Sequence, residues 1–91
     1  MIIRNDQVIN GKIDHIYIGN DTEIICWACV DLVELPNWEN VTKVDCRSCT
    51  KLTKLPDWKN ITDVDCDGCI RLTSLPNWKN VTNVSCNGCT S

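Results

Sequence analysis

Apolar positions recur along this chain with a period of twenty residues. Residues 41–60 and 61–80 carry the same skeleton at the same spacing: Val41, Val44, Cys46, Cys49, Leu52, Leu55 and Trp58, then Ile61, Val64, Cys66, Cys69, Leu72, Leu75 and Trp78. The preceding stretch carries Ile24, Cys26, Cys29, Leu32, Leu35 and Trp38, and the last residues carry Val81, Val84, Cys86 and Cys89. A fixed period of this length is typical of a stack of repeated structural units.

Each repeat contains one short alternating segment. Residues 44–46, 64–66 and 84–86 read apolar, polar, apolar, which predicts half-buried strands with valine and cysteine inward. Stacked in register, these strands form a parallel sheet. The leucines and tryptophan then line a return arm, where Pro36, Pro56 and Pro76 disfavour a continuous helix. The expected fold is mainly β with irregular arms, a short parallel sheet and little or no α-helix.

The start of the chain fits the period poorly. Counting back twenty places from Cys26 and Cys29 gives Asp6 and Ile9. Residues 16–18 alternate as a strand does, and Asn10-Gly11 between apolar runs indicates a tight turn. We therefore expect residues 1–19 to form a degenerate N-terminal capping unit, followed by repeats at 20–39, 40–59, 60–79 and a partial one at 80–91.

The repeat resembles a leucine-rich repeat of the short, cysteine-containing type. Val64 and Cys66 take the second and third leucine positions, Cys69 takes the Asn/Cys position, and Leu72 takes the apolar position that follows. Cysteine at the third leucine position, the short period and the tryptophan of the return arm depart from the family pattern. The combination is similar to repeats in large-genome viruses of amoebae and in some bacterial effectors. The resemblance implies a solenoid that binds proteins and carries no conserved chemistry.

Size and charge exclude several classes of function. Ninety-one residues make one domain, and the net charge of −3 without blocks of like charge gives no footprint for nucleic acid or an anionic membrane. No apolar run reaches the length of a membrane span. The first residues show no secretory leader, so we expect a cytoplasmic protein, in a host cytoplasm or a virion if the viral resemblance holds.

The eight cysteines leave three interpretations open. We expect two inward columns: Cys26, Cys46, Cys66 and Cys86 in one, and Cys29, Cys49, Cys69 and Cys89 in the other. The first interpretation is that they are buried thiols that behave as small apolar side chains. The second is disulfide bonds, within each C-x-x-C pair or between neighbouring repeats. The third is a zinc, iron–sulfur or redox role, although repetition alone explains the spacing. The leading expectation includes no metal and no cofactor.

The outward positions of the sheet form the candidate protein-binding surface. From repeat to repeat they change from apolar to mixed, acidic and neutral, and the residues expected to bind a partner are Trp27, Ile25, Asp45, Arg47, Asp63, Asp65 and Asp67. Trp27 lies where other repeats carry charged or polar residues, so it is either a binding anchor or a contact with the N-terminal unit. Trp38, Trp58 and Trp78 are expected to stack as a structural column.

Three further patterns carry weaker functional alternatives. The Asp63-x-Asp65-x-Asp67-Gly68 run matches the start of a calcium loop, but Ser74 stands where its final glutamate belongs. Five N-x-S/T triplets, beginning at Asn20, Asn40, Asn60, Asn80 and Asn83, are either glycosylation sites or turn-capping asparagines. His15 is the only histidine, and no catalytic set appears at a meaningful spacing, so we expect no enzyme activity.

The last repeat predicts self-association. The chain ends two residues after Cys89, without a return arm, which leaves the strand of the last repeat as an unpaired edge. We expect contacts between copies through Val84, Ser85, Cys86 and Asn87, as a two-fold dimer or a head-to-tail stack. The leading functional hypothesis is a non-enzymatic protein-interaction module that self-associates. The alternatives are a building block made rigid by disulfides and a metal or redox protein.

Overall fold

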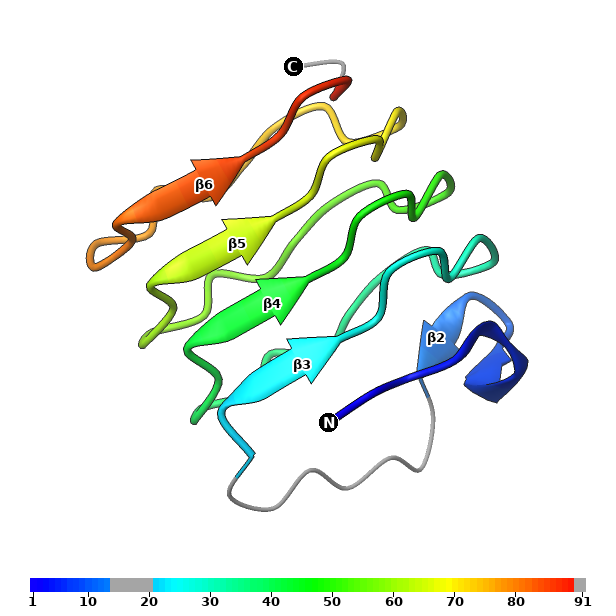
Figure 1. Cartoon of the computed structure of the whole chain (residues 1–91), viewed down its shortest axis with the longest axis horizontal. Helices are drawn as coiled ribbons and strands as arrows, with labels where there is room; N and C mark the ends of the chain where they lie inside the picture. The colour runs from blue at the N-terminus through cyan, green and yellow to red at the C-terminus, as the bar shows by residue number, and fades with distance from the viewer. Residues whose placement is uncertain (14–20, 90–91) are drawn as a thin grey trace.

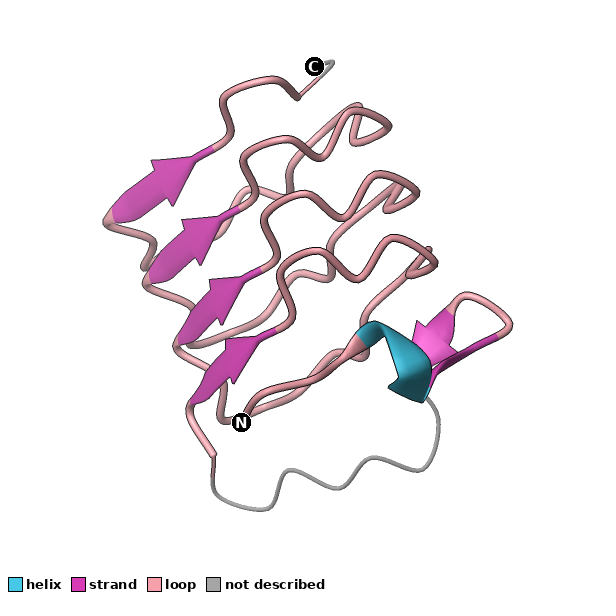
Figure 2. Cartoon of the chain, turned by 45° about the vertical axis from the view of Figure 1, so that its right-hand side comes forward, coloured by secondary structure: helices cyan, strands magenta, loops and turns pink. Residues whose placement is uncertain are grey.

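The computed structural model describes residues 1–13 and 21–89 and shows a small, mainly β protein with almost no helix. Four short strands, β3 (Glu23–Ile25), β4 (Lys43–Asp45), β5 (Asp63–Asp65) and β6 (Asn83–Ser85), form one parallel sheet in that order (Figure 1). Long irregular segments connect one strand to the next behind the sheet (Figure 2). The expected class, mainly β with irregular arms and a short parallel sheet, is confirmed.

The strands pair in the register that the twenty-residue period predicts. Val44 lies opposite Val64, and Val64 lies opposite Val84. The strands β4, β5 and β6 are shifted by one residue toward the N-terminus from the expected segments 44–46, 64–66 and 84–86, because the cysteine that follows each strand starts a turn. The ladder nevertheless continues past the strand, since the amides of Cys46 and Cys66 donate to the carbonyls of Asp65 and Ser85 at 2.8 Å.

Every C-x-x-C segment is a tight turn whose third residue has a positive φ. Ala28, Ser48, Gly68 and Gly88 occupy this position with φ of 63°, 61°, 77° and 83°. The turn is closed in the last two repeats by hydrogen bonds from the amides of Cys69 and Cys89 to the carbonyls of Cys66 and Cys86, at 3.2 Å. The turn therefore sends both cysteines of a pair to the interior.

The core lies between the sheet and the return segments. It consists of the strand valines and isoleucines, the inward cysteines, the return-arm leucines, and two tryptophans. Trp58 and Trp78 are 1% and 5% exposed, and their rings stack with centroids 6.1 Å apart. Their indole N–H groups donate to the carbonyls of Pro36 and Pro56 at 3.0 and 2.9 Å. The tryptophan column is confirmed for this pair, while Trp38 is half-buried against the core.

Threonine and asparagine side chains tie neighbouring repeats together. The hydroxyls of Thr42, Thr62 and Thr82 donate to the carbonyl of the threonine one repeat earlier, at 3.1–3.3 Å. The amide groups of Asn60 and Asn80 donate to the carbonyls of Glu39 and Lys59. The N-x-T triplets at residues 60–62 and 80–82 thus have a structural use between repeats. Asn20 lies outside the described residues.

The N-terminal segment covers the outer edge of β3. The amide of Ile3 donates to the carbonyl of Ile25, and the amide of Ile25 donates to the carbonyl of Met1, both at 2.8 Å. Ile2 forms an isolated parallel β-bridge with Ile25. Residues of the N-terminal segment therefore pair with residues 23 positions later in the chain, whereas β3–β6 pair at an offset of twenty. The poor fit of this segment to the twenty-residue period is explained by this offset, which displaces its residues by three.

The rest of the N-terminal unit is a short 3₁₀ turn, η1 (Asn5–Gln7), and the hairpin of β1 (Val8–Ile9) and β2 (Lys12–Ile13). The predicted Asn10-Gly11 turn is confirmed, with φ of 53° and 81°. The carbonyl of Gly11 accepts the amide of Val33 at 2.7 Å, and a Cβ on Gly11 would approach Val33 to 2.8 Å. Residues 16–18, where a further strand was expected, and His15 lie outside the described residues.

Candidate functional site

The outer face of the sheet is the first candidate site, and we call it the sheet face. It consists of the outward strand positions of β3–β6 and the residues just after them. A groove of about 440 Å³ runs across it, lined on every strand by outward residues such as Glu23, Asp45, Asp63 and Ser85. The structure brings the expected binding residues onto this one face, because alternate positions of in-register parallel strands point the same way.

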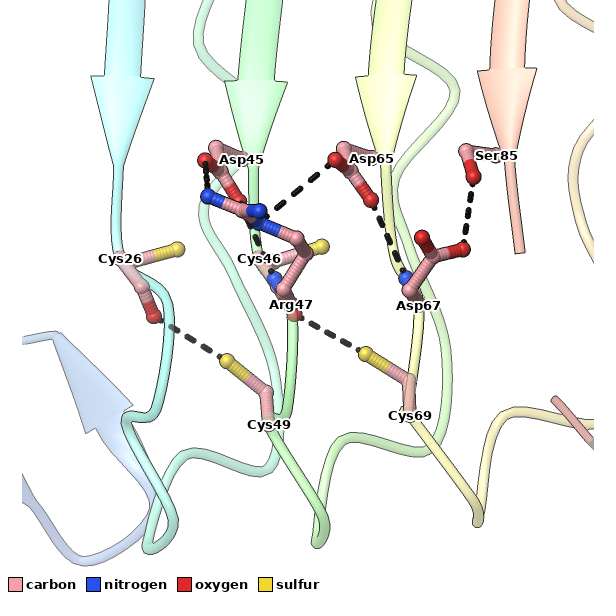
Figure 3. Close-up of polar contacts among 9 residues, drawn as sticks. All are labelled: Cys26, Asp45, Cys46, Arg47, Cys49, Asp65, Asp67, Cys69 and Ser85. Carbon is pink, nitrogen blue, oxygen red and sulfur yellow. Dashed lines mark hydrogen bonds and ion pairs between the residues drawn. The ribbon is translucent and has the colours of Figure 1, made fainter. Parts of the chain in front are cut away.

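Charged side chains on the sheet face are paired both within a repeat and between neighbouring repeats. Arg47 donates from Nε and Nη2 to the two carboxylate oxygens of Asp45 at 3.0 Å, and its Nε lies 3.6 Å from Asp65 (Figure 3). The hydrogen bond and charge of Asp45 raise the pKa of Arg47. Lys43 lies 3.9 Å from Asp63. Aspartates outnumber these two cations, so the face keeps an acidic excess at β5.

Asp67 connects β5 to the last repeat. Its Oδ1 accepts the hydroxyl of Ser85 and the amide of Asn87, both at 2.7 Å. These two hydrogen bonds, the hydroxyl of Ser85 first, lower the pKa of Asp67. Asp67 is therefore a contact between repeats, and Asp63, Asp65 and Asp67 do not gather around a common point as calcium ligands would: within the described residues they form no group of carboxylates close enough to share an ion.

An apolar patch lies at the N-terminal end of the sheet face. Ile2 and Trp27 are 66% and 57% exposed, and Ile25 is half-buried between them. We call these three residues the apolar patch. With Ile3, Arg4 and Asn5 they line a pocket of about 360 Å³. The guanidinium of Arg47 lies 5.8 Å from the centre of the Trp27 ring, within the range of a cation–π contact.

Trp27 lies beside the N-terminal unit, and its role as a binding anchor stays a prediction. The indole contributes to a pocket with residues of the N-terminal unit, yet more than half of its surface stays exposed. The sequence did not indicate that Ile2, Arg4 and Asn5 would join it, because the repeat period skips this segment. The only available signal was the apolar pair Ile2-Ile3 itself.

The cysteines form the second candidate site, a ladder along the interior. Cys26, Cys29, Cys46, Cys49, Cys66 and Cys69 have no exposed surface, so the expected inward columns are confirmed for three repeats. Cys86 and Cys89 are partly exposed. All eight are free thiols in the structure.

The second thiol of each pair donates a hydrogen bond to the preceding repeat. Cys49, Cys69 and Cys89 donate to the carbonyls of Cys26, Cys46 and Cys66 at 3.2, 3.0 and 3.2 Å, as Figure 3 shows for the first two. Cys29 continues the series at 3.4 Å, and its acceptor is the carbonyl of Ile3. The N-terminal segment thus supplies the carbonyl that a cysteine supplies elsewhere.

The interior favours the protonated form of Cys26, Cys29 and Cys46. The hydrogen-bonded neighbours Cys49 and Cys69, together with burial, raise the pKa of Cys26 and of Cys46. The hydrogen bonds to Cys26 and Cys46 lower the pKa of the partner thiols, Cys49 and Cys69. Burial raises the pKa of Cys29 to about 11, and the proximity of Cys49 adds to the shift. A reactive cysteine needs a lowered pKa and solvent access, which Cys26, Cys29 and Cys46 lack.

Within residues 1–13 and 21–89, three sulfurs at the last repeat form the one group of three metal-binding side chains whose ligand atoms are close enough to share an ion. The Sγ atoms of Cys66, Cys86 and Cys89 are all within 4.8 Å of one another. The sequence spacing did not single them out, because all four C-x-x-C pairs look alike.

The predicted self-association residues lie together on β6 and the turn after it. Val84 is 42% exposed, against 3% for Val44 and Val64 at the same position of the repeat. Ser85 and Asn87 are hydrogen-bonded to Asp67, and Cys86 is partly exposed.

No described helix is long and apolar enough to cross a membrane.

The geometry therefore defines a class, a small mainly β protein with a four-stranded parallel sheet and a cysteine-lined interior. Comparison of the chain with protein-family models, with curated proteins and with solved structures finds no match.

Proposed function

We propose that the protein is a leucine-rich-repeat solenoid and acts as a non-enzymatic protein-interaction module through its sheet face. Support for the solenoid comes from the register of β3–β6 and from burial of Val64, Cys66, Cys69 and Leu72 at the positions that carry the family pattern. Parallel strands in register present one side chain per repeat at each outward position. A partner therefore meets columns of side chains along a groove.

The observation that carries the proposal is the apolar patch beside the groove. Apart from Ile25, the outward strand positions of β3–β6 are charged or polar, whereas Ile2 and Trp27 expose most of their surface next to a pocket. Partly exposed tryptophan beside a pocket is typical of an interface anchor. The pocket is suited to one apolar side chain of the partner.

The distribution of charge on the sheet face favours one orientation of a bound partner. Arg47 is held by Asp45 and Asp65 beside the apolar patch, while Asp63 and Asp65 on β5 are half-exposed. A partner segment with an apolar residue at the patch and basic residues toward β5 matches this arrangement. Electrostatic attraction of this kind speeds association and sets orientation more than it adds affinity.

The experiment compares affinity purifications from the source cells with quantitative mass spectrometry. The bait is wild type, Trp27→Ala, the double variant Asp63→Lys/Asp65→Lys, or Val30→Ala as a matched control that removes an exposed apolar side chain elsewhere. Circular dichroism first verifies that all four proteins are folded. We expect the same proteins to be enriched by wild type and Val30→Ala and lost from the other two. Identical enrichment by all four would eliminate the sheet face as the binding surface.

Self-association through β6 is a second proposed property, favoured by one observation. Among the described residues β6 has a strand neighbour on one side only, and Val84 loses the cover that Val44 and Val64 have. The far edge of β3 is occupied by Met1–Ile3, so pairing of β6 with β6 about a two-fold axis is favoured over a head-to-tail stack.

Sedimentation velocity across a range of concentrations tests this contact. Wild type should sediment as a dimer at high concentration, and Val84→Lys should shift the equilibrium to monomer. Val30→Lys is the matched control, since Val30 is 43% exposed and Val84 is 42% exposed. A monomeric wild type, or equal effects of the two lysines, would rule out β6 as the contact.

A further inference from the structure

The last repeat contains a group of three sulfurs that differs from the rest of the cysteine ladder. Cys86 and Cys89 come from the turn after β6, and Cys66 comes from the end of β5. Their Sγ atoms lie within 4.8 Å of one another, whereas no other such group occurs in the part of the chain that the structure describes. We propose that Cys66, Cys86 and Cys89 bind one Zn²⁺ ion per chain, with the fourth position open to solvent.

The spacing of the sulfurs fits a tetrahedral thiolate site. With Zn–S bonds of about 2.3 Å, the sulfurs of such a site are separated by about 3.8 Å. The upper limit of 4.8 Å in the free protein therefore requires only small side-chain rotations. Two ligands from a C-x-x-C turn and a third from a neighbouring segment is an arrangement that zinc accepts, and thiolates favour soft or borderline ions over Mg²⁺ or Ca²⁺.

Access separates this group from the inner cysteines. Cys66 is fully buried, as are Cys26, Cys29, Cys46, Cys49 and Cys69, so the difference in access comes from the other two ligands. Cys86 and Cys89 are partly exposed, so an ion can approach the three sulfurs from the side of these two residues. Zinc with three protein ligands commonly keeps a water molecule in its fourth position. An exposed side of the site is where that water would bind.

Binding changes one hydrogen bond and releases protons. In the free protein the thiol of Cys89 donates to the carbonyl of Cys66 at 3.2 Å. Each thiol gives up its proton to the solvent when its sulfur coordinates Zn²⁺, so the Cys89 side chain must turn away from that carbonyl. The turn itself stays closed by the hydrogen bond from the amide of Cys89 to the carbonyl of Cys86, and Gly88 accommodates its φ of 83°.

Anaerobic titration of the reduced full chain with Co²⁺, followed by displacement with Zn²⁺, tests the site. We expect one Co²⁺ per chain, with an intense thiolate charge-transfer band that Zn²⁺ removes. Cys86→Ser and Cys89→Ser should each weaken binding at least tenfold. Cys26→Ser, at the opposite end of the same column as Cys86, is the control and should bind with wild-type affinity. Alkylation with mass spectrometry should find Cys86 and Cys89, the two partly exposed ligands, protected by Zn²⁺.

Two further measurements keep the result independent of folding and of self-association. Circular dichroism must show that each serine variant is folded, and Val84→Lys, which retains all three sulfurs, should still bind one Co²⁺ per chain. Absence of the charge-transfer band in wild type, unchanged affinity in both Cys86→Ser and Cys89→Ser, or half an ion per chain would overturn the proposal. None of these outcomes depends on the sheet face or on the apolar patch.

Discussion

The two edges of the parallel sheet carry the same kind of strand but differ in their surroundings. At β3 the outer edge is occupied by Met1–Ile3, and Ile24 is fully buried. At β6 no described strand lies on the outer side, and Val84, the residue at the same position of the repeat, is 42% exposed. The same thiol hydrogen bond also has a buried donor at one end, Cys29, and a partly exposed one at the other, Cys89.

This difference shows that position in the stack decides what a repeated residue does. A cysteine with a repeat on both sides is a small core residue with one weak hydrogen bond. The same residue without an outer neighbour is exposed to solvent and to ions. The inward positions of the repeats are nearly uniform in sequence, so chemical differences among the cysteines arise where the stacking changes.

The largest expected effect is a difference in the free energy of unfolding between two truncations, Ile24→Ala in β3 and Val84→Ala in β6. Ile24→Ala should destabilise the protein by about 2–5 kcal/mol, because it leaves a cavity in the core. Val84→Ala should cost under about 0.5 kcal/mol, since much of that side chain already faces solvent. Val64→Ala, in the middle of the stack, controls for the chemistry of the valine truncation. Urea unfolding followed by tryptophan fluorescence measures all three, and equal losses at Ile24 and Val84 would contradict the difference between the edges.

Removing a thiol donor should have a smaller effect that also depends on position. Cys69→Ala leaves the carbonyl of Cys46 without its thiol donor in the buried interior, which costs about 1–3 kcal/mol. Cys89→Ala removes the corresponding bond in a partly exposed site, where water replaces the donor, and should cost under about 1 kcal/mol. The free energy of unfolding in urea under reducing conditions gives both values. A larger loss for Cys89→Ala would mean that the last repeat is the better packed one.

Alkaline pH should lower the stability of the protein through Cys29, which lies beside the N-terminal segment. Its folded pKa of about 11 lies above the value of about 8.5 in an unfolded chain. The protonated thiol therefore contributes stability that is complete below about pH 8.5 and is lost as the pH rises toward 11. The slope for this one thiol is at most about 1.4 kcal/mol per pH unit. Thermal melts from pH 7 to 11 in reductant should show a flatter decline for Cys29→Ala than for wild type, and an unchanged slope would contradict burial of this thiol.

The smallest effect is expected at Asp67. Asp67→Asn should reduce amide exchange protection in β6, because Oδ1 no longer carries the charge that accepts from Ser85 and Asn87. The pKa of Asp67 is lowered in the folded protein, so this contribution is present above about pH 3.9 and is lost as the pH falls below it. Hydrogen exchange with mass spectrometry provides the measurement. Asp57→Asn, at an exposed position of the return arm, is the control and should leave β6 unchanged.

Repetition made most of the fold predictable. The spacing of Val44, Val64 and Val84 specifies which residues pair, because only one register keeps every apolar position inward. Burial of the cysteine columns and the stacking of Trp58 on Trp78 follow from the same spacing. The Asn10-Gly11 turn was predictable because few residue pairs adopt positive φ so readily.

The sequence alone therefore determined the period, the strand positions and the inward face, since local alternation and a fixed repeat length constrain them without distant contacts. Only the tertiary structure decided that Ile3, 23 residues before Cys26, supplies the carbonyl that a cysteine supplies in the later repeats. It also decided that Ile2 joins Trp27 in the apolar patch and that Cys66, Cys86 and Cys89 form a distinct group. Each of these depends on which segment lies beside which at the edges of the stack. The repeat period does not predict the contacts at these edges, because it describes only a repeat that has a neighbour on both sides.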